Sequence, residues 1–431
     1  MPIVACSTPP GISGIAVVRV SGKRALKNVS SFIKGANLHK KSVGSGVHLL
    51  VDKDNVVFDE AVITTYLEPN SYTGENMVEI SCHGNPVIVS KIIDLSLAAG
   101  ASLAEPGEFT KRSYLNDKMD LSEAEAVSSV IHSKSIAGVK AGAKNLKGGL
   151  SKEIGECKKS LISVVANLEF NLDISEDELQ PNLIKNSLNV LTKTMLTLAS
   201  LLESFNESRM FQDGASVVIV GPPNAGKSTL FNALINKDQS IVTDIEGTTR
   251  DVIEKNIYIR GLPVLLKDTA GLRRSVDVVE KLGVARSVEE SRDADLVILL
   301  NHNNQNSQNK NSLQVFNKID VESPHKNKKY DICISAKTGK NIAELKTLIH
   351  KSLINKNITE NVLLTTKRQY SAVSSCANQL KSACALLSEK NSLELVVEDL
   401  NRAISFLDNI TSKTTKDDVL DAVFSSFCVG K

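Results

Sequence analysis

The sequence predicts a multidomain α/β protein: an N-terminal α+β domain, a helical bundle domain, and a third domain with a doubly wound sheet inserted into the bundle. Three observations predict this architecture. Runs of branched residues and helical stretches are mixed up to residue 118, and helical spacing dominates from there to residue 212. A strand, a glycine-containing turn and a helix then follow in order. Helical spacing returns after residue 356. The expected boundaries are 1–118, 119–212, 213–356 and 357–431.

The N-terminal segment carries start and stop signals for its elements. Branched residues predict strands over residues 15–20 and 60–67. Pro86 predicts the start of a helix that should end near Gly100, because proline fits the first helical turn and glycine favours the position after the last one. Ser122 and Glu125 have the spacing of a capping box and indicate where the next helix begins.

The two helical stretches flank the inserted domain. Apolar residues recur in steps of three and four over residues 188–205 and again over 396–407, which predicts helices packed along a shared seam. Because these stretches lie on both sides of 213–356, we expect one bundle, with the two insertion points close together. The polar stretch 301–310 cannot bury a core and is interpreted as a surface loop.

Composition limits the kinds of partner. Lys and Arg total 51 and Asp and Glu total 49, a formal net charge of +2, so any nucleic acid must be bound by a local patch. Trp is absent and aromatic residues make up 4%, which disfavours a platform that stacks single-stranded bases. No signal peptide or membrane-length apolar run is found, so we expect a cytoplasmic protein without membrane contact. Seven scattered cysteines are interpreted as reduced thiols, with no zinc site.

The segment 221–228, GPPNAGKS, is typical of a phosphate-binding loop. It follows the apolar run 217–220 and precedes an apolar helical stretch, as such a loop requires. Gly221 and Gly226 allow the backbone to curl and approach phosphate without a Cβ in the way. Lys227 can place a positive charge at the β and γ phosphates, and the Ser228 hydroxyl can reach their Mg²⁺.

Three later segments resemble motifs of the GTPase superfamily and imply an inserted Ras-like P-loop GTPase domain. The segment NKID at 317–320 resembles the motif in which an aspartate reads the guanine edge, and SAK at 335–337 resembles the segment behind the base. The segment DTAG at 268–271 resembles the switch that senses the γ-phosphate. The resemblance assigns these residues to GTP: Asn224, Ala225, Gly226, Lys227, Ser228, Thr229, Asp268, Thr269, Ala270, Gly271, Asn317, Lys318, Ile319, Asp320, Ser335, Ala336 and Lys337.

A closer resemblance covers the chain from end to end. Segments at 8–11, 19–22, 72–84 and 106–118, together with the ending FCVGK at 427–431, resemble the MnmE (TrmE) family of tRNA modification GTPases. The ending departs from the common form only by Val429 in place of Ile.

The resemblance implies an N-terminal domain that binds folate and forms a homodimer. It also implies a heterotetramer with the flavoprotein MnmG (GidA), which adds an aminomethyl or carboxymethylaminomethyl group to C5 of the wobble uridine of certain tRNAs. The implied one-carbon donor is 5-formyl-tetrahydrofolate or a related tetrahydrofolate. The residues matched to its site are Arg19, Glu79, Lys118 and Lys431. Their chemistry fits, because a carboxylate can pair with the pterin edge and cations can hold the glutamate tail.

The GTPase motifs depart from those of Ras relatives at the residue that orients the attacking water. Leu272 stands where Ras relatives have Gln, and an apolar side chain cannot position water. The nearby polar candidates are Arg273, Arg274, Asp277 and Glu280, of which the family resemblance selects Glu280.

The family resemblance also implies K⁺ in place of an arginine finger. Asn224 would bind the ion with the carbonyls of Thr243, Ile245 and Thr248, and Thr249 would join Ser228 on Mg²⁺. Hydrolysis should then depend on K⁺ and on pairing of two GTPase domains. The loop residues assigned to GTP here are Thr243, Asp244, Ile245, Glu246, Gly247, Thr248 and Thr249, with Arg250, Asp251 and Arg273 supporting the ordered loop.

Two questions stay open on sequence alone. Cys428 is a catalytic participant in the modification or an apolar anchor, because the sequence guarantees no group that would activate its thiol. A ribosome-assembly GTPase of the Era or Der kind shares the phosphate loop and the NKID motif. Such proteins carry an RNA-binding domain or a second GTPase unit, neither of which is found here. A purely regulatory switch is the third alternative, and it would not need the folate residues.

Overall fold

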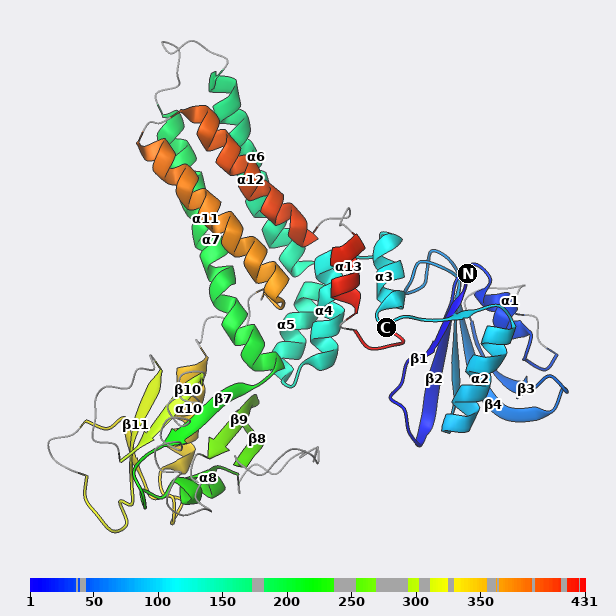
Figure 1. Ribbon diagram of the computed structural model, residues 1–431, viewed down its shortest axis with the longest axis horizontal. Coiled ribbons are helices and arrows are strands. Elements are labelled where there is room, and N and C mark those ends of the chain that lie inside the picture. Colours follow the sequence, from blue (N-terminus) through cyan, green and yellow to red (C-terminus); the bar gives the residue numbers. More distant parts are fainter. Residues whose placement is uncertain are drawn as a thin grey trace, which may run out of the picture. The chain divides into compact units, whose positions relative to one another are not determined.

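The computed structural model describes residues 1–35, 38, 44–172, 182–235, 253–268, 294–301, 311–324, 329–354, 362, 364–389, 392–411, 417–425 and 427–431. The chain divides into two compact units (Figure 1). One contains Met1–Ser128 together with Ile404–Lys431, and the other contains Ser129–Ala403. The predicted domain boundaries at residues 118, 212 and 356 stay predictions.

The first unit is built on a six-stranded sheet with the order β3-β4-β5-β2-β1-β6. Its paired strands are antiparallel except for β1 and β6, which are parallel. The strands are β1 (Ile3–Cys6), β2 (Ser13–Ser21), β3 (Gly44–Val51), β4 (Val57–Tyr66), β5 (Met77–Gly84) and β6 (Ser102–Leu103). Helices α1 (Ala25–Ser30) and α2 (Pro86–Ala98) bury residues such as Val29 and Ile92 in one core with the sheet residues Val18 and Ile80.

The predicted strands and helix of this unit are confirmed. Residues 15–20 lie in β2, and most of 60–67 lies in β4. Helix α2 begins at Pro86, where the Asn85 side chain accepts a hydrogen bond from the amide of Val87. Gly100, with φ of 90°, follows the end of the helix. These signals depend on neighbouring residues, so they predict the elements without knowledge of contacts to distant parts of the chain.

The chain returns to the first unit near its C-terminal end. Helices α3 (Glu108–Leu115), α4 (Leu121–His132) and α13 (Asp417–Phe424) share an apolar cluster that includes Tyr114, Leu121 and Phe424. The ammonium of Lys111 lies 2.6 Å from the carboxylate of Asp421, which is 310 residues away in sequence. A Cβ on Gly107 would lie 2.7 Å from the Phe424 carbonyl oxygen, so only glycine permits this packing.

The predicted capping box at the start of α4 is wrong by two residues. The pair that caps the helix is Asp120 and Glu123: the Glu123 amide donates to the Asp120 carboxylate, and the Asp120 amide donates to the Glu123 carboxylate. Ser122 instead donates its hydroxyl to Asp120. Aspartate caps as well as serine does, and here it is the residue directly before Leu121, the first helical residue.

The bundle lies in the second unit, where α6 (Gly149–Leu172), α7 (Leu183–Gln212) and α11 (Lys367–Ser388) run side by side in Figure 1. Helix α5 (Ile136–Leu146) and the part of α12 (Leu393–Thr411) up to Ala403 also belong to this unit. The predicted stripe over 396–407 is confirmed, because Val396, Leu400, Ala403 and Leu407 are all fully buried. Among the described residues, no helix is both long and apolar enough to cross a membrane.

The predicted seam on α7 is only partly right. Leu191, Leu198 and Leu201 are buried, and the same buried line includes Thr194 and Ser204. Met195, Leu202 and Phe205 of the predicted seam are only partly buried. These hydroxyls can be buried because each is satisfied: Thr194 donates to Val190, and Ser204 donates to Leu201 while it accepts from the Leu364 amide. Their small side chains let α7 pack closely.

A doubly wound sheet is inserted into the bundle, as the sequence predicts. Its order is β12-β11-β10-β7-β9-β8, with β8 antiparallel to β9 and the other pairs parallel. The strands are β7 (Ala215–Val220), β8 (Ile253–Ile259), β9 (Leu262–Asp268), β10 (Leu296–Leu300), β11 (Ser312–Asn317) and β12 (Ile332–Ile334), and the helices are α8 (Lys227–Ile235) and α10 (Ile342–Leu353).

The two faces of this sheet bury different side chains. In β7, Val217 and Ile219 belong to the larger core, whereas Val218 belongs to a second cluster on the opposite face. Phe211, near the end of α7, packs into the larger core, and the chain returns beside α7 where Leu364 meets Ser204. The chain thus leaves the bundle at the end of α7 and returns beside the same helix, which is the geometry that an inserted domain requires.

Candidate nucleotide and folate sites

The predicted phosphate loop joins the end of β7 to the start of α8. Asn224 and Gly226 both adopt left-handed backbone conformations, with φ of 63° and 90°. A Cβ on Gly221 would lie 2.4 Å from the carbonyl oxygen of Leu300, and one on Gly226 would lie 2.4 Å from the side-chain nitrogen of Asn317. Glycine is therefore required at both ends of the loop, for close packing at Gly221 and for packing and conformation at Gly226.

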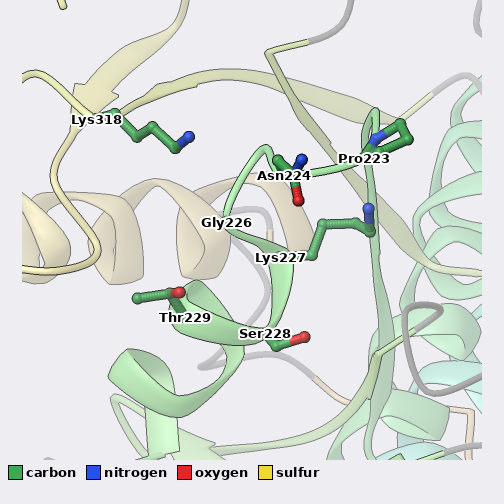
Figure 2. A pocket seen from close by; sticks show the side chains of 7 residues that line it. All are labelled: Pro223, Asn224, Gly226, Lys227, Ser228, Thr229 and Lys318. Carbon is green, nitrogen blue, oxygen red and sulfur yellow. The ribbon is translucent and has the colours of Figure 1, made fainter. Parts of the chain in front are cut away.

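A cavity of about 400 Å³ opens at this loop (Figure 2). Figure 2 shows Lys318 across the cavity from Asn224, while Ser228 and Thr229 lie at the start of α8. The Lys227 ammonium donates to the carbonyl oxygens of Gly221 and Pro222, at 2.9 and 3.0 Å. The lining residues are Pro223, Asn224, Gly226, Lys227, Ser228, Thr229 and Lys318. Two cations and a helix start around one cavity favour an anion.

Asn317 joins the phosphate loop to the segment that the motifs place behind the base. Its side chain is nearly fully buried, donates to the carbonyl oxygen of Ala225 at 2.9 Å and accepts from the amide of Ala336 at 2.9 Å. Each polar atom of its amide is thus satisfied within the protein. Asn317 is therefore a fixed connector between the phosphate loop and the segment that the motifs place behind the base.

Asp320 lies at the exposed end of the NKID segment. A hydrogen bond from the Ser335 side chain, aided by the nearby Lys337 and Lys318, holds the pKa of Asp320 below its ordinary value. Ser335 itself is fully buried and accepts from the Thr338 amide at 3.2 Å, so its position is fixed. The carboxylate is therefore kept charged, as an acceptor for two N–H donors must be.

Part of the predicted site lies outside the described residues. Asp268 ends β9, where its backbone is in register with Ile253 and Ile219. The predicted water-orienting Glu280 and its neighbours are outside the part of the chain that the structure describes. The other predicted site residues that lie outside the described part of the chain are Thr243, Asp244, Ile245, Glu246, Gly247, Thr248, Thr249, Arg250, Asp251, Thr269, Ala270, Gly271 and Arg273.

A second polar cluster lies on the sheet of the first unit. Arg19 donates to one oxygen of Glu79 from two nitrogens, at 3.0 and 2.7 Å, and the Tyr66 hydroxyl donates to the other oxygen at 3.2 Å. The guanidinium of Arg19 lies 5.4 Å from the ring centre of Tyr72 and 5.5 Å from that of Phe109. The Arg19–Glu79 ion pair is thus held by Tyr66 at the carboxylate and by the rings of Tyr72 and Phe109 at the guanidinium.

The C-terminal segment docks beside this pair. The carbonyl oxygen of Gly430 accepts from Arg19 at 3.3 Å and from the Ser7 hydroxyl at 3.0 Å. Gly430 has φ of 94°, and a Cβ there would lie 2.6 Å from the Cys6 carbonyl oxygen. Burial, reinforced by the positive charge of Arg19, lowers the pKa of Lys431, while Glu79 opposes this shift.

The structure brings together three of the four predicted folate residues: Arg19, Glu79 and Lys431. Lys118 instead donates its ammonium to the Pro69 carbonyl oxygen at 3.0 Å. Cys428 is exposed, and its carbonyl oxygen accepts from the Gly107 amide at 3.4 Å.

Sequence reasoning missed three aromatic residues around Arg19. Tyr72 and Phe109 belong to the very segments that carry the family resemblance, so these two could have been found. Tyr66 is diagonal to Glu79 across the β4–β5 pair, in which Thr64 is opposite Glu79. Its contact depends on strand register, which the sequence did not supply.

Two protein-family models match this chain. A family model described as the MnmE helical domain matches residues 121–428, and one described as the GTP-binding protein TrmE N-terminus matches residues 2–118. The tRNA modification GTPase MnmE of Thermotoga petrophila is 38% identical, over 100% of this chain and 99% of its own. That of Aquifex aeolicus is 37% identical, with the same coverage.

Among solved structures, the G domain of the T. maritima FeoB iron transporter is 27% identical and has a TM-score of 0.23, covering 32% of this chain and 99% of its own. The full-length identity to the named relatives, together with the two family models, decides the assignment. The chain belongs to the MnmE family of tRNA modification GTPases and is a GTP hydrolase.

Proposed function

We propose that this chain is a K⁺-dependent GTPase that works with the flavoprotein MnmG in a heterotetramer. The complex would add an aminomethyl or carboxymethylaminomethyl group to C5 of the wobble uridine of certain tRNAs, with a tetrahydrofolate as one-carbon donor. The observation that carries the proposal is the Arg19–Glu79 pair, locked by Tyr66 and by the C-terminal segment. A protein that was only a nucleotide switch would not need this second site.

At the nucleotide site, the residues around the cavity have the chemistry that GTP and Mg²⁺ require. The Lys227 ammonium donates to the carbonyl oxygens of Gly221 and Pro222, and with GTP bound it would instead contact the β and γ phosphates. Ser228 lines the cavity and offers a hydroxyl oxygen, the kind of ligand that Mg²⁺ prefers, with Thr249 as the proposed second ligand. When bound, Mg²⁺ would neutralise phosphate charge as the γ-phosphoryl group leaves.

Asn224 is the proposed K⁺ ligand, with the carbonyls of Thr243, Ile245 and Thr248. Its side chain lines the cavity beside the phosphate loop, and an amide oxygen is a suitable ligand for this cation. A monovalent cation there would supply the positive charge that an arginine finger supplies in other GTPases. Glu280 is the proposed residue that orients the attacking water, and pairing of two GTPase domains in the homodimer would order the loop.

Replacing K⁺ by Na⁺ at constant Mg²⁺ should lower GTP turnover about tenfold or more, because the smaller ion fits the proposed ligands poorly. The measurement is the steady-state rate of phosphate release in the two salts at equal ionic strength. Asn224→Gly keeps the left-handed backbone but removes the amide oxygen, so it should be slow in both salts, whereas Asn224→Asp keeps an oxygen ligand. Equal wild-type rates in K⁺ and Na⁺ would contradict this role of K⁺.

At the folate site, Glu79 is the proposed partner of the pterin edge. Its carboxylate accepts from Arg19 and Tyr66, and two oxygens with about four lone pairs leave room for a further donor. Three nitrogens of Arg19 already donate within the protein, so we assign Arg19 chiefly to holding Glu79. Lys431 and Lys118 would then provide the positive charge for the glutamate tail, and Cys428 remains a candidate participant in the modification.

Glu79→Gln should weaken binding of 5-formyl-tetrahydrofolate about tenfold or more, because an amide cannot replace a charged acceptor. Isothermal titration calorimetry measures the affinity, and nucleoside analysis of tRNA from cells with only this variant measures modification. Glu60→Gln is the matched control, since Glu60 is an exposed residue of β4 in the same sheet. Unchanged folate affinity and unchanged tRNA modification in Glu79→Gln would remove the folate proposal and favour a regulatory switch.

A further inference from the structure

Asn301 stands at the point where β10 ends, on the strand that lies between β7 and β11. Its φ of 52° is left-handed, a conformation that asparagine and glycine adopt more readily than other residues. The polar sequence of residues 301–310 predicts a surface loop and no role for Asn301. Its side chain is nevertheless turned onto β11, the strand that delivers the NKID segment.

The side chain of Asn301 extends the parallel ladder by one hydrogen bond. Backbone pairing of β10 and β11 ends at Leu300 and Val315, after which the Asn301 amide still donates to Val315 at 2.9 Å. Beyond that point, the side-chain oxygen of Asn301 accepts from the amide of Asn317 at 2.7 Å. The reverse contact, from the Asn301 side-chain nitrogen to the Asn317 carbonyl oxygen, is 3.5 Å and contributes little.

Asn317, whose amide bonds to Asn301, connects two parts of the nucleotide site. The Asn317 side chain spans from the carbonyl oxygen of Ala225, in the phosphate loop, to the amide of Ala336, in the segment behind the base. Its nitrogen lies so close to Gly226 that no Cβ could be placed between them. Because Asn317 is buried and satisfied on both sides, a shift of its backbone would move both parts of the site together.

We propose that Asn301 is a positioning residue for the guanine nucleotide: its side-chain oxygen fixes Asn317, and through Asn317 it sets the distance between the phosphate loop and the base-binding segment. This inference rests on the nucleotide site proposed above. Asn301 is not one of the residues that line the cavity at the phosphate loop. It therefore acts on the affinity for the whole nucleotide, GDP as well as GTP, and not on the cleavage step.

The test compares Asn301→Gly with Asn301→Asp. Both residues tolerate the left-handed backbone, but only aspartate keeps an oxygen for the Asn317 amide. Asn301→Gly should raise Kd for both GDP and GTP about fivefold to tenfold, with kcat at saturating GTP within about twofold of the wild type. Asn301→Asp should stay within about twofold of wild type in Kd. Fluorescent nucleotide titration and steady-state turnover provide these values.

Three outcomes would overturn the inference. Asn301→Gly could bind both nucleotides like the wild type, it could lower only Tm, or Asn301→Asp could lose as much affinity as Asn301→Gly. Lys227→Ala separates this inference from the proposal beneath it. If Lys227→Ala binds GTP normally, the proposed nucleotide site is wrong, whereas normal binding by Asn301→Gly alone overturns only the positioning role.

Discussion

Gly226→Ala should lower the affinity for GTP about 1000-fold. A new Cβ would lie 2.4 Å from the side-chain nitrogen of Asn317, and Asn317 cannot turn away without breaking its hydrogen bonds to Ala225 and Ala336. Alanine also tolerates φ of 90° poorly. The loop relieves backbone strain of ~1 to 3 kcal/mol only by leaving its phosphate-binding conformation, and restoring this conformation for GTP, with two weakened buried hydrogen bonds of about 1 kcal/mol each, would cost roughly 4 kcal/mol. Each 1.4 kcal/mol is a factor of about ten.

Gly261→Ala is the matched control for this experiment. Gly261 lies in the turn between β8 and β9 with φ of 82°, and a Cβ there would meet nothing within 4 Å. It carries a similar backbone strain without a collision, so it should lose some thermal stability and keep its GTP affinity. Nucleotide titration with Tm measured in parallel checks both variants. If the two glycine variants bind GTP equally well, the collision with Asn317 has no influence on the site.

Asp320→Asn should lower the affinity for GTP about 1000-fold and raise the affinity for xanthosine triphosphate. The carboxylate would accept from the two N–H donors of guanine, whereas an amide presents a donor to one of them. One hydrogen bond is replaced by two donors that face each other, and the other loses its charged acceptor; at ~1.5 to 3 kcal/mol for each hydrogen bond to a charged group, these changes account for the size of the loss. Xanthine has a carbonyl oxygen where guanine has its amino group, so the amide nitrogen has a partner there. Competition titrations with the two triphosphates measure the exchange.

The control for Asp320→Asn is Glu322→Gln, which removes a charge two positions away on an exposed residue. It should keep the preference for GTP. Because the pKa of Asp320 is lowered, its carboxylate form persists as pH falls through the ordinary titration range of aspartate, and guanine affinity should be lost only at lower pH. A variant Asp320→Asn that still prefers GTP would show that another group reads the base.

The parts of the fold and site that sequence predicted are those with local signals. The left-handed conformation in the phosphate loop favours Gly226, the geometry of a helix start favours Pro86, and the chemistry of guanine favours Asp320. Each requirement acts within a few residues of the chain or on a ligand of known shape. The structure has the left-handed turn at Gly226 and the helix start at Pro86, whereas the role of Asp320 in guanine binding stays a prediction.

The parts that sequence did not predict depend on distant pairing. The polar neighbours of Asn301 predict a loop, while its actual partner, Asn317, is brought to it by the register of two parallel strands. The packing of Gly430 against Arg19 joins residues 411 positions apart. On α7, buried Thr194 and Ser204 interrupt an apolar pattern because hydrogen bonds satisfy their hydroxyls. None of these contacts produces a periodic pattern in the sequence.

The discontinuous first unit has a consequence for the chain as it leaves the ribosome. Lys111 and its partner Asp421 are 310 residues apart, so at about 5–20 residues per second the second helix arrives roughly 15 to 60 s after the first. During that interval Tyr114 and Leu121 lack the aromatic ring of Phe424 that later covers them. During translation this apolar surface therefore stays uncovered, and it is the kind of surface that chaperones bind.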